Sequence, residues 1–253
     1  MPANEWETLD FALESTLDLS LITQLLGPVG AKSLAPFRVA GAPTVKASGR
    51  FFGPKARANT VDLLQVEART MGEFRFSGFP LQDVSFSTTL KGDEIAVDKF
   101  YGTYAGGAAS GQARVWGRGA ERRVGFDMAL ENASLGQAAT SLQVFLAQQK
   151  GLPPPPAGRF VQERANVHLD LAASAEGRYD DLYSYRGEGN AVLKGAGIGE
   201  VPLLGLLSEL FTFTSLRFNE ARGNFKIDGP RLVFPQIELR GGAETEHGRF
   251  LQD

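Results

Sequence analysis

The stretch that decides the fold is residues 73–115, EFRFSGFPLQDVSFSTTLKGDEIAVDKFYGTYAGGAASGQARV. Apolar and polar residues alternate on both sides of residues 91–93 (KGD), and the stretch ends in a patch of small residues. Residues 221–250 (ARGNFKIDGPRLVFPQIELRGGAETEHGRF) repeat this layout around residues 228–229 (DG). Alternation with a period of two, broken by short Gly turns, is typical of antiparallel hairpins with one apolar face. The sequence therefore predicts a mainly β fold built on a long, curved antiparallel sheet.

The composition excludes several classes of protein. Hydrophobic residues make up 43% of the 253 residues and charged residues 22%, which indicates a folded globular chain. A net charge of −3 gives no long-range attraction to phosphate, so nucleic acid is not expected as a partner. The absence of cysteine removes disulfides, thiolate metal sites and cysteine nucleophiles. The first ten residues do not form a secretion signal, and the longest apolar run, 201–213, is too short for a membrane span.

About three short helices are expected beside the strands. The first covers about residues 19–26, where Asp18 or Ser20 can cap the start and Gly27-Pro28 is expected to end it before a linker. The other two are expected at about 134–150 and 202–211, from apolar residues at helical spacing.

Four consecutive prolines at 153–156 form a stiff spacer and mark the best internal boundary. This boundary divides the chain into residues 1–152 and 153–253. We expect these ranges to be the two parts of one continuous module, itself a piece of a longer protein.

No motif in the chain predicts a catalytic or metal site. His168 and His247 have no partners at a metal-binding spacing, and the acidic residues near His247 are better explained by a solvated loop. The glycines at 195–199 lack the Lys-Ser/Thr ending of a phosphate loop. The acidic pairs at 93–94 and 180–181 lie at turns. We therefore expect no enzyme activity, no metal and no cofactor.

The alternating apolar residues have two interpretations. In one, each apolar face packs against the helices and forms an ordinary core. In the other, the sheet curls into an open trough and a lipid tail covers its apolar face. The argument for the second interpretation is a shortage of cover, since few helices are available for many strands and an uncovered apolar strip usually marks a binding surface. The alternation by itself leaves both interpretations open. An acyl chain of about 16 carbons would gain ~12 kcal/mol before ordering costs, at roughly 0.8 kcal/mol per buried methylene.

Residues 81–115 and residues 187–227 (GEGNAVLKGAGIGEVPLLGLLSELFTFTSLRFNEARGNFKI) resemble the AsmA-like family of bacterial envelope proteins, which includes AsmA, TamB and YhdP relatives. The second segment resembles the C-terminal region of these proteins, and residues 17–50 fit more loosely. The resemblance implies a U-shaped β-groove, or half-barrel, with an apolar interior that carries phospholipid between the inner and outer membranes. It also implies a periplasmic protein that is anchored to the inner membrane in its full-length form.

We therefore predict a non-enzymatic lipid-binding groove module, with phospholipid acyl chains as ligand and with inner- and outer-membrane proteins as further partners. Strand parity gives twelve groove-lining candidates: Phe74, Phe76, Val84, Phe86, Leu90, Phe126, Met128, Leu130, Val167, Leu169, Phe225 and Ile227. The alternative is a structural or assembly module for outer-membrane biogenesis that binds client strands by β-augmentation. A third hypothesis, a carbohydrate-binding sandwich, is weakened by the presence of only two tryptophans.

Overall fold

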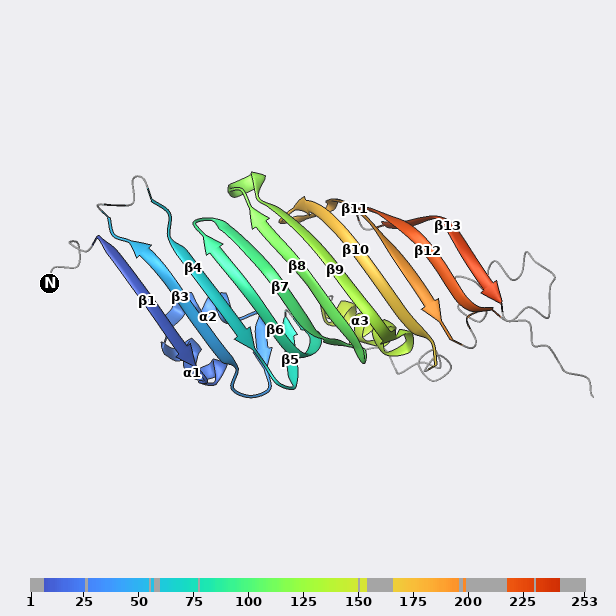
Figure 1. Cartoon of the computed structure of the whole chain (residues 1–253), viewed down its shortest axis with the longest axis horizontal. Coiled ribbons are helices and arrows are strands. Elements are labelled where there is room, and N and C mark those ends of the chain that lie inside the picture. Colours follow the sequence, from blue (N-terminus) through green and yellow to red (C-terminus); the bar gives the residue numbers. More distant parts are fainter. Residues whose placement is uncertain are drawn as a thin grey trace, which may run out of the picture.

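The computed structural model describes residues 7–25, 27–54, 56, 60–76, 78–149, 151–153, 166–195, 198, 218–229 and 231–241. These residues form a mainly β structure (Figure 1). In chain order the elements are β1 (Thr8–Ser15), α1 (Leu19–Leu25), α2 (Gly27–Leu34), β2 (Phe37–Val39), β3 (Thr44–Phe52), β4 (Leu63–Arg69), β5 (Glu73–Phe76), β6 (Phe79–Lys91), β7 (Glu94–Tyr104), β8 (Gly107–Trp116), the 3-10 helix η1 (Gly119–Glu121), β9 (Arg123–Ser134), α3 (Leu135–Gln149), β10 (His168–Arg178), β11 (Asp181–Lys194), β12 (Phe218–Asp228) and β13 (Arg231–Gly241).

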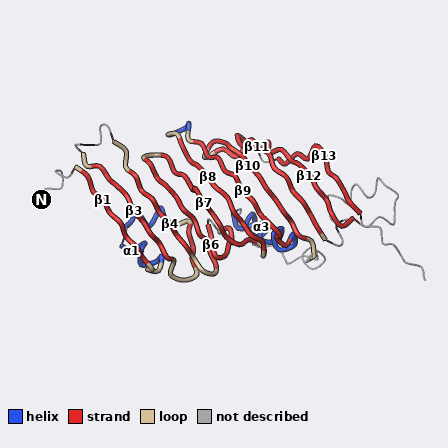
Figure 2. The backbone as a smooth tube through the Cα atoms, viewed as in Figure 1, coloured by secondary structure: helices blue, strands red, loops and turns tan. Residues whose placement is uncertain are grey.

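All the described strands belong to one antiparallel sheet of 13 strands, which confirms the predicted fold class. The main path runs β1-β3-β4-β6-β7-β8-β9-β10-β11-β12-β13, and the short β2 pairs with β5, which in turn pairs with β6. Figure 2 shows these strands side by side, with β1 and β13 at opposite ends. Because the two end strands do not pair with each other, the sheet is open, and this form fits a curved sheet or groove.

The sheet continues through the predicted internal boundary. β9 lies before the proline-rich segment and β10 after it, and the two strands pair along most of their length. The division into residues 1–152 and 153–253 stays a prediction about the chain's organisation.

The hairpin turns follow the predicted Gly chemistry. Lys91 pairs with Glu94, so that Gly92, with φ +60°, and Asp93 form the two-residue loop between β6 and β7. The β7–β8 hairpin turns at residues 105–106, both of which have positive φ. Two consecutive left-handed residues are the hallmark of a type I′ turn, whose twist matches that of the strands it joins.

The helices confirm two sequence predictions and correct a third. The Asp18 carboxylate accepts the backbone N–H of Ser20 at 2.8 Å and caps α1, and α3 begins one residue after Ser134. The expected linker after Gly27-Pro28 is wrong, because these residues begin α2. Proline suits the first turn of a helix, where its missing N–H would have no intrahelical partner. The predicted helix at 202–211 lies outside the described residues.

The α-helices lie toward the lower ends of the strands in Figure 1. The best-defined contact is made by α3. The hydroxyl of Tyr104 donates a hydrogen bond to the carbonyl of Ala138 at 2.9 Å, and the rings of Phe79 and Phe145 meet edge-on with centroids 5.4 Å apart. α3 therefore covers one end of the face to which Tyr104 belongs.

Candidate functional site

The strand register assigns the side chains of the sheet to two faces, since residues directly opposite each other on neighbouring strands point to the same side. One line of register partners crosses every strand of the main path: Leu13, Ala47, Val66, Thr88, Val97, Ala113, Phe126, Ala175, Gly187, Ile227 and Leu232. No member is charged, and Thr88 alone is polar. We call the side that carries this line the apolar face.

A second line of partners runs parallel to the first on the same side. It consists of Val45, Ala68, Phe86, Phe100, Gly111, Met128, Ala173, Gly189 and Phe225. From β3 to β12 no member of this second line is polar, and on β1 Ser15 lies opposite Val45. The apolar face is therefore continuous across the width of the described sheet.

The sequence-predicted residues on the main strands fall on this face. They are Phe86, Leu90, Phe126, Met128, Leu130, Leu169, Phe225 and Ile227. The register places these eight residues on one side of the sheet, and their role in lining a groove stays a prediction.

The other four candidates lie in special settings. Phe74 and Phe76 belong to the short strand β5, where Phe74 is buried and Phe76 is half-exposed. Val84 is fully buried at a bulge, where the Thr70 hydroxyl both accepts its N–H and donates to its carbonyl. Val167 directly precedes β10, and it packs with Ile198 and other apolar residues in a small closed core.

Sequence reasoning missed Phe100 on this face. The register shifts between Val97 and Phe100, so that these residues point to the same side although they are three apart in sequence. A β-bulge of this kind changes which residues alternate. Simple parity from Val97 assigns Phe100 to the opposite face, and only the pairing with β8 reveals the bulge.

Exposure varies strongly along the apolar face. Phe225 is 4% exposed and Leu130 is 9% exposed, whereas Met128 is 48% exposed and Leu232, on the end strand β13, is 59% exposed. Part of the face is therefore filled by its own side chains, and part is open to solvent.

Two aromatic side chains, the buried Phe225 and the partly exposed Tyr185, lie across glycines of the neighbouring strand. A Cβ atom on Gly189 would lie 2.3 Å from the Phe225 ring, and one on Gly177 would lie 2.6 Å from the Tyr185 ring. The ring of Phe225 also approaches the ring of Phe234 at 5.4 Å between centroids. These rings therefore gain part of their shelter from neighbouring strands of the sheet itself.

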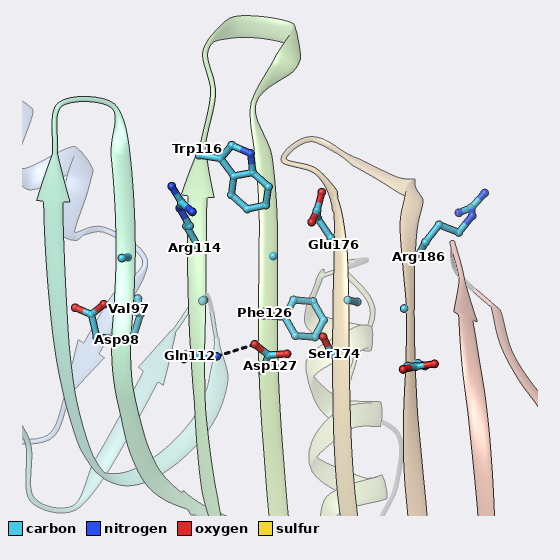
Figure 3. A pocket seen from close by; sticks show the side chains of 16 residues that line it. Val97, Asp98, Gln112, Arg114, Trp116, Phe126, Asp127, Ser174, Glu176 and Arg186 are labelled. Carbon is cyan, nitrogen blue, oxygen red and sulfur yellow. Dashed lines mark hydrogen bonds between the residues drawn. The ribbon is translucent and has the colours of Figure 1, made fainter.

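The opposite side, the polar face, carries a hollow of about 780 Å³ between β7 and β11 (Figure 3). Figure 3 shows Trp116, Arg114 and Glu176 around it, with the Gln112 amide donating to the Asp127 carboxylate at 2.8 Å. Most of its charged groups already pair with neighbours on adjacent strands, and exposed pairs of this kind contribute about 0–1 kcal/mol.

Charged side chains on the polar face form hydrogen bonds and ion pairs with side chains of the neighbouring strands. Hydrogen bonds from Ser174 and then Gln112 lower the pKa of the Asp127 carboxyl. Arg123 pairs with Glu176 at 2.6 Å. The Arg123–Glu176 pair joins β9 to β10, and the Gln112–Asp127 hydrogen bond joins β8 to β9, so these groups support the pairing of neighbouring strands.

The described residues include no group of three His, Cys, Asp or Glu side chains able to hold a metal ion. His168 lies on the polar face opposite Lys194, while His247 and its acidic neighbours lie outside the described residues. In the part of the chain that the structure describes, no helix has the length and hydropathy needed to cross a membrane.

Comparison of the chain with family models, with curated proteins and with solved structures found no match. The class of protein that the described residues define is an open antiparallel sheet with one apolar and one polar face.

Proposed function

We propose that this chain is a non-enzymatic lipid-binding module whose apolar face holds phospholipid acyl chains. The observation that supports the proposal is the uncharged line of register partners from Leu13 to Leu232, on a face that the described helices cover only in part. An apolar surface of this extent requires a cover in water, because large exposed patches otherwise lead to association. A lipid tail is a cover of matching chemistry.

The open parts of the face are the expected contact sites. Met128 lies in the middle of the sheet and is half-exposed, and it is flanked along its register line by the small residues Gly111 and Ala173. Each methylene of an acyl chain buried there would contribute roughly 0.8 kcal/mol. The buried Phe225, by contrast, supports the sheet and has little surface left for a ligand.

The proposal includes a cellular role, which is supported by the sequence resemblance alone. The module would be part of a periplasmic protein, anchored to the inner membrane in its full-length form, that carries phospholipid between the inner and outer membranes of the envelope. The headgroups of the bound phospholipids would remain at the open edge of the groove.

Native mass spectrometry of gently purified protein tests lipid binding. We expect co-purified phospholipid in the wild type and its loss in Met128→Asp, because a carboxylate there would have to be desolvated by the acyl chain. The matched control is Ser110→Asp, on the polar face of the adjacent strand β8, which adds the same charge and should retain lipid. Lipid-free wild-type protein, or equal lipid loss in both variants, would contradict the proposal.

The second candidate function is strand capture by β-augmentation in outer-membrane assembly. The observation that favours it is the open end of the sheet at β1, which among the described strands pairs with β3 alone. Lipid-free protein that binds an unfolded client strand, with no change in Met128→Asp, would favour this function over lipid binding.

A further inference from the structure

Among the described strands none pairs with the outer edge of β1, and the strand is regular. Figure 1 shows β1 at the end of the sheet, and its register with β3 is unbroken from Thr8 to Ser15. The carbonyl of Glu7 accepts the N–H of Gly53 at 2.8 Å, so the backbone groups of the odd-numbered residues face β3. Those of Thr8, Asp10, Ala12 and Glu14 therefore face outward.

β1 lacks the features with which proteins usually prevent edge pairing. The other end strand, β13, contains Pro235, and its register with β12 shifts twice. Prolines and bulges of this kind block the addition of a further strand. β1 has neither proline nor bulge, and its exposed Leu9 and Leu13 (52% and 49%) lie on the apolar face.

The two acidic side chains of β1 are directed back toward β3. Asp10 pairs with Arg50 at 2.5 Å and Glu14 pairs with Lys46 at 3.6 Å. The outward edge therefore presents backbone groups with little competing free charge, and a new strand could pair with it directly.

The sequence of β1 is complementary to itself in one register. In an antiparallel pair centred on Phe11, the Phe11 residues of two copies lie opposite each other, and Leu9 of each copy lies opposite Leu13 of the other. All of these side chains point to the apolar face. A register centred between two residues would instead place apolar side chains opposite polar ones.

The charged side chains on the polar face distinguish this register from the two alternative registers that are shifted by one residue at the centre. Centring on Phe11 places Asp10 opposite Ala12 and Thr8 opposite Glu14, all with outward-facing backbone groups. Centring on Asp10 would place two Asp10 carboxylates opposite each other, and centring on Ala12 would place Asp10 opposite Glu14 twice. Like charges directly opposite each other destabilise a strand pair.

We propose that β1 is a self-pairing edge through which two copies of this chain form one continuous sheet, antiparallel at the junction and centred on Phe11. The two-fold axis is perpendicular to the sheet, so the apolar faces of both copies lie on the same side. The inference is independent of lipid binding, because it depends only on backbone pairing and on the residues of β1.

Sedimentation velocity of the full chain over a range of concentrations tests the proposal. We expect a monomer–dimer equilibrium for the wild type and a monomer for Ala12→Pro. The N–H of Ala12 faces outward, so proline removes a bond of the dimer and none of the monomer, and edge strands tolerate proline in that orientation. The matched control Ala12→Val keeps the N–H and should keep the dimer.

A charge series at the same position tests the register. A lysine at position 12 of each copy would lie opposite Asp10 of the other copy, which makes two such pairs in the dimer. Ala12→Lys should therefore lower the dimer Kd by about two- to thirty-fold, and Ala12→Asp should raise it by a similar factor. Circular dichroism would verify that each variant folds. A wild type that is monomeric at every concentration, or a dimer unaffected by Ala12→Pro, would overturn the proposal; the second result would indicate association through the apolar faces.

Discussion

Truncation of one buried and one exposed residue tests whether the apolar face is open. Phe225→Ala removes a ring that is 4% exposed and packed on Gly189 and Phe234. Replacing a buried Phe by Ala costs about 3–5 kcal/mol, and we expect about 3 kcal/mol because β12 lies next to the end strand β13, where neighbours can shift into the space. Met128 is 48% exposed, so Met128→Ala loses only part of a buried side chain and should cost about 1 kcal/mol.

Urea unfolding of delipidated protein, followed by far-UV circular dichroism, measures both losses. With a slope of about 2 kcal/mol/M, the midpoint should fall by about 1.5 M for Phe225→Ala and by about 0.5 M for Met128→Ala. Removal of lipid matters because a ligand bound to the folded state would raise both midpoints. Equal losses for the two variants would refute the reasoning, since they would mean that Met128 is covered in solution as completely as Phe225.

Three further outcomes follow from particular contacts. The pKa of Asp170 is lowered chiefly by a hydrogen bond from Lys194, so the carboxylate stabilises the fold above its ordinary pKa of about 4, and this contribution is lost as pH falls. Asp170→Asn should therefore be less stable than the wild type at neutral pH. In a pH series of urea midpoints, its stability should also fall less steeply toward acid pH. Ala105 has φ +50°, a left-handed conformation that asparagine adopts more readily than alanine. Ala105→Asn should therefore raise the free energy of unfolding by about 0.5–1 kcal/mol and raise the thermal midpoint, and a lower midpoint would contradict this. Tyr104→Phe removes the bond to Ala138 and should cost about 1 kcal/mol with faster amide exchange in α3; unchanged exchange there would show that this bond does not hold the helix.

The alternation in the sequence predicted the sheet and its faces well. Phe126, Met128 and Leu130 share one side of β9 because side chains of a strand alternate with a period of two, whatever the neighbouring strands are. The turn at Gly92 was predictable for a similar reason, since its geometry depends on a few consecutive residues.

The missed features depend on contacts between segments that are distant in sequence. Phe100 shares a face with Val97 only because β8 pairs with β7 across a bulge. The pairing of β5 with β2 likewise joins segments that are distant in sequence, Phe37–Val39 and Glu73–Phe76. α2 was missed for a different reason: the Gly-Pro pair at 27–28 can end one helix and also begin the next.

The sequence by itself determined that this chain forms strands with one apolar side, because side-chain direction along a strand is a property of the local backbone. Only the tertiary structure decided which apolar side chains are sheltered and which are free. Phe225 contacts Gly189 of β11 and Phe234 of β13 and is 4% exposed, whereas Met128 lies between Gly111 and Ala173 and is 48% exposed. Burial depends on the neighbour that each strand acquires, and the period of the sequence carries no information about that neighbour.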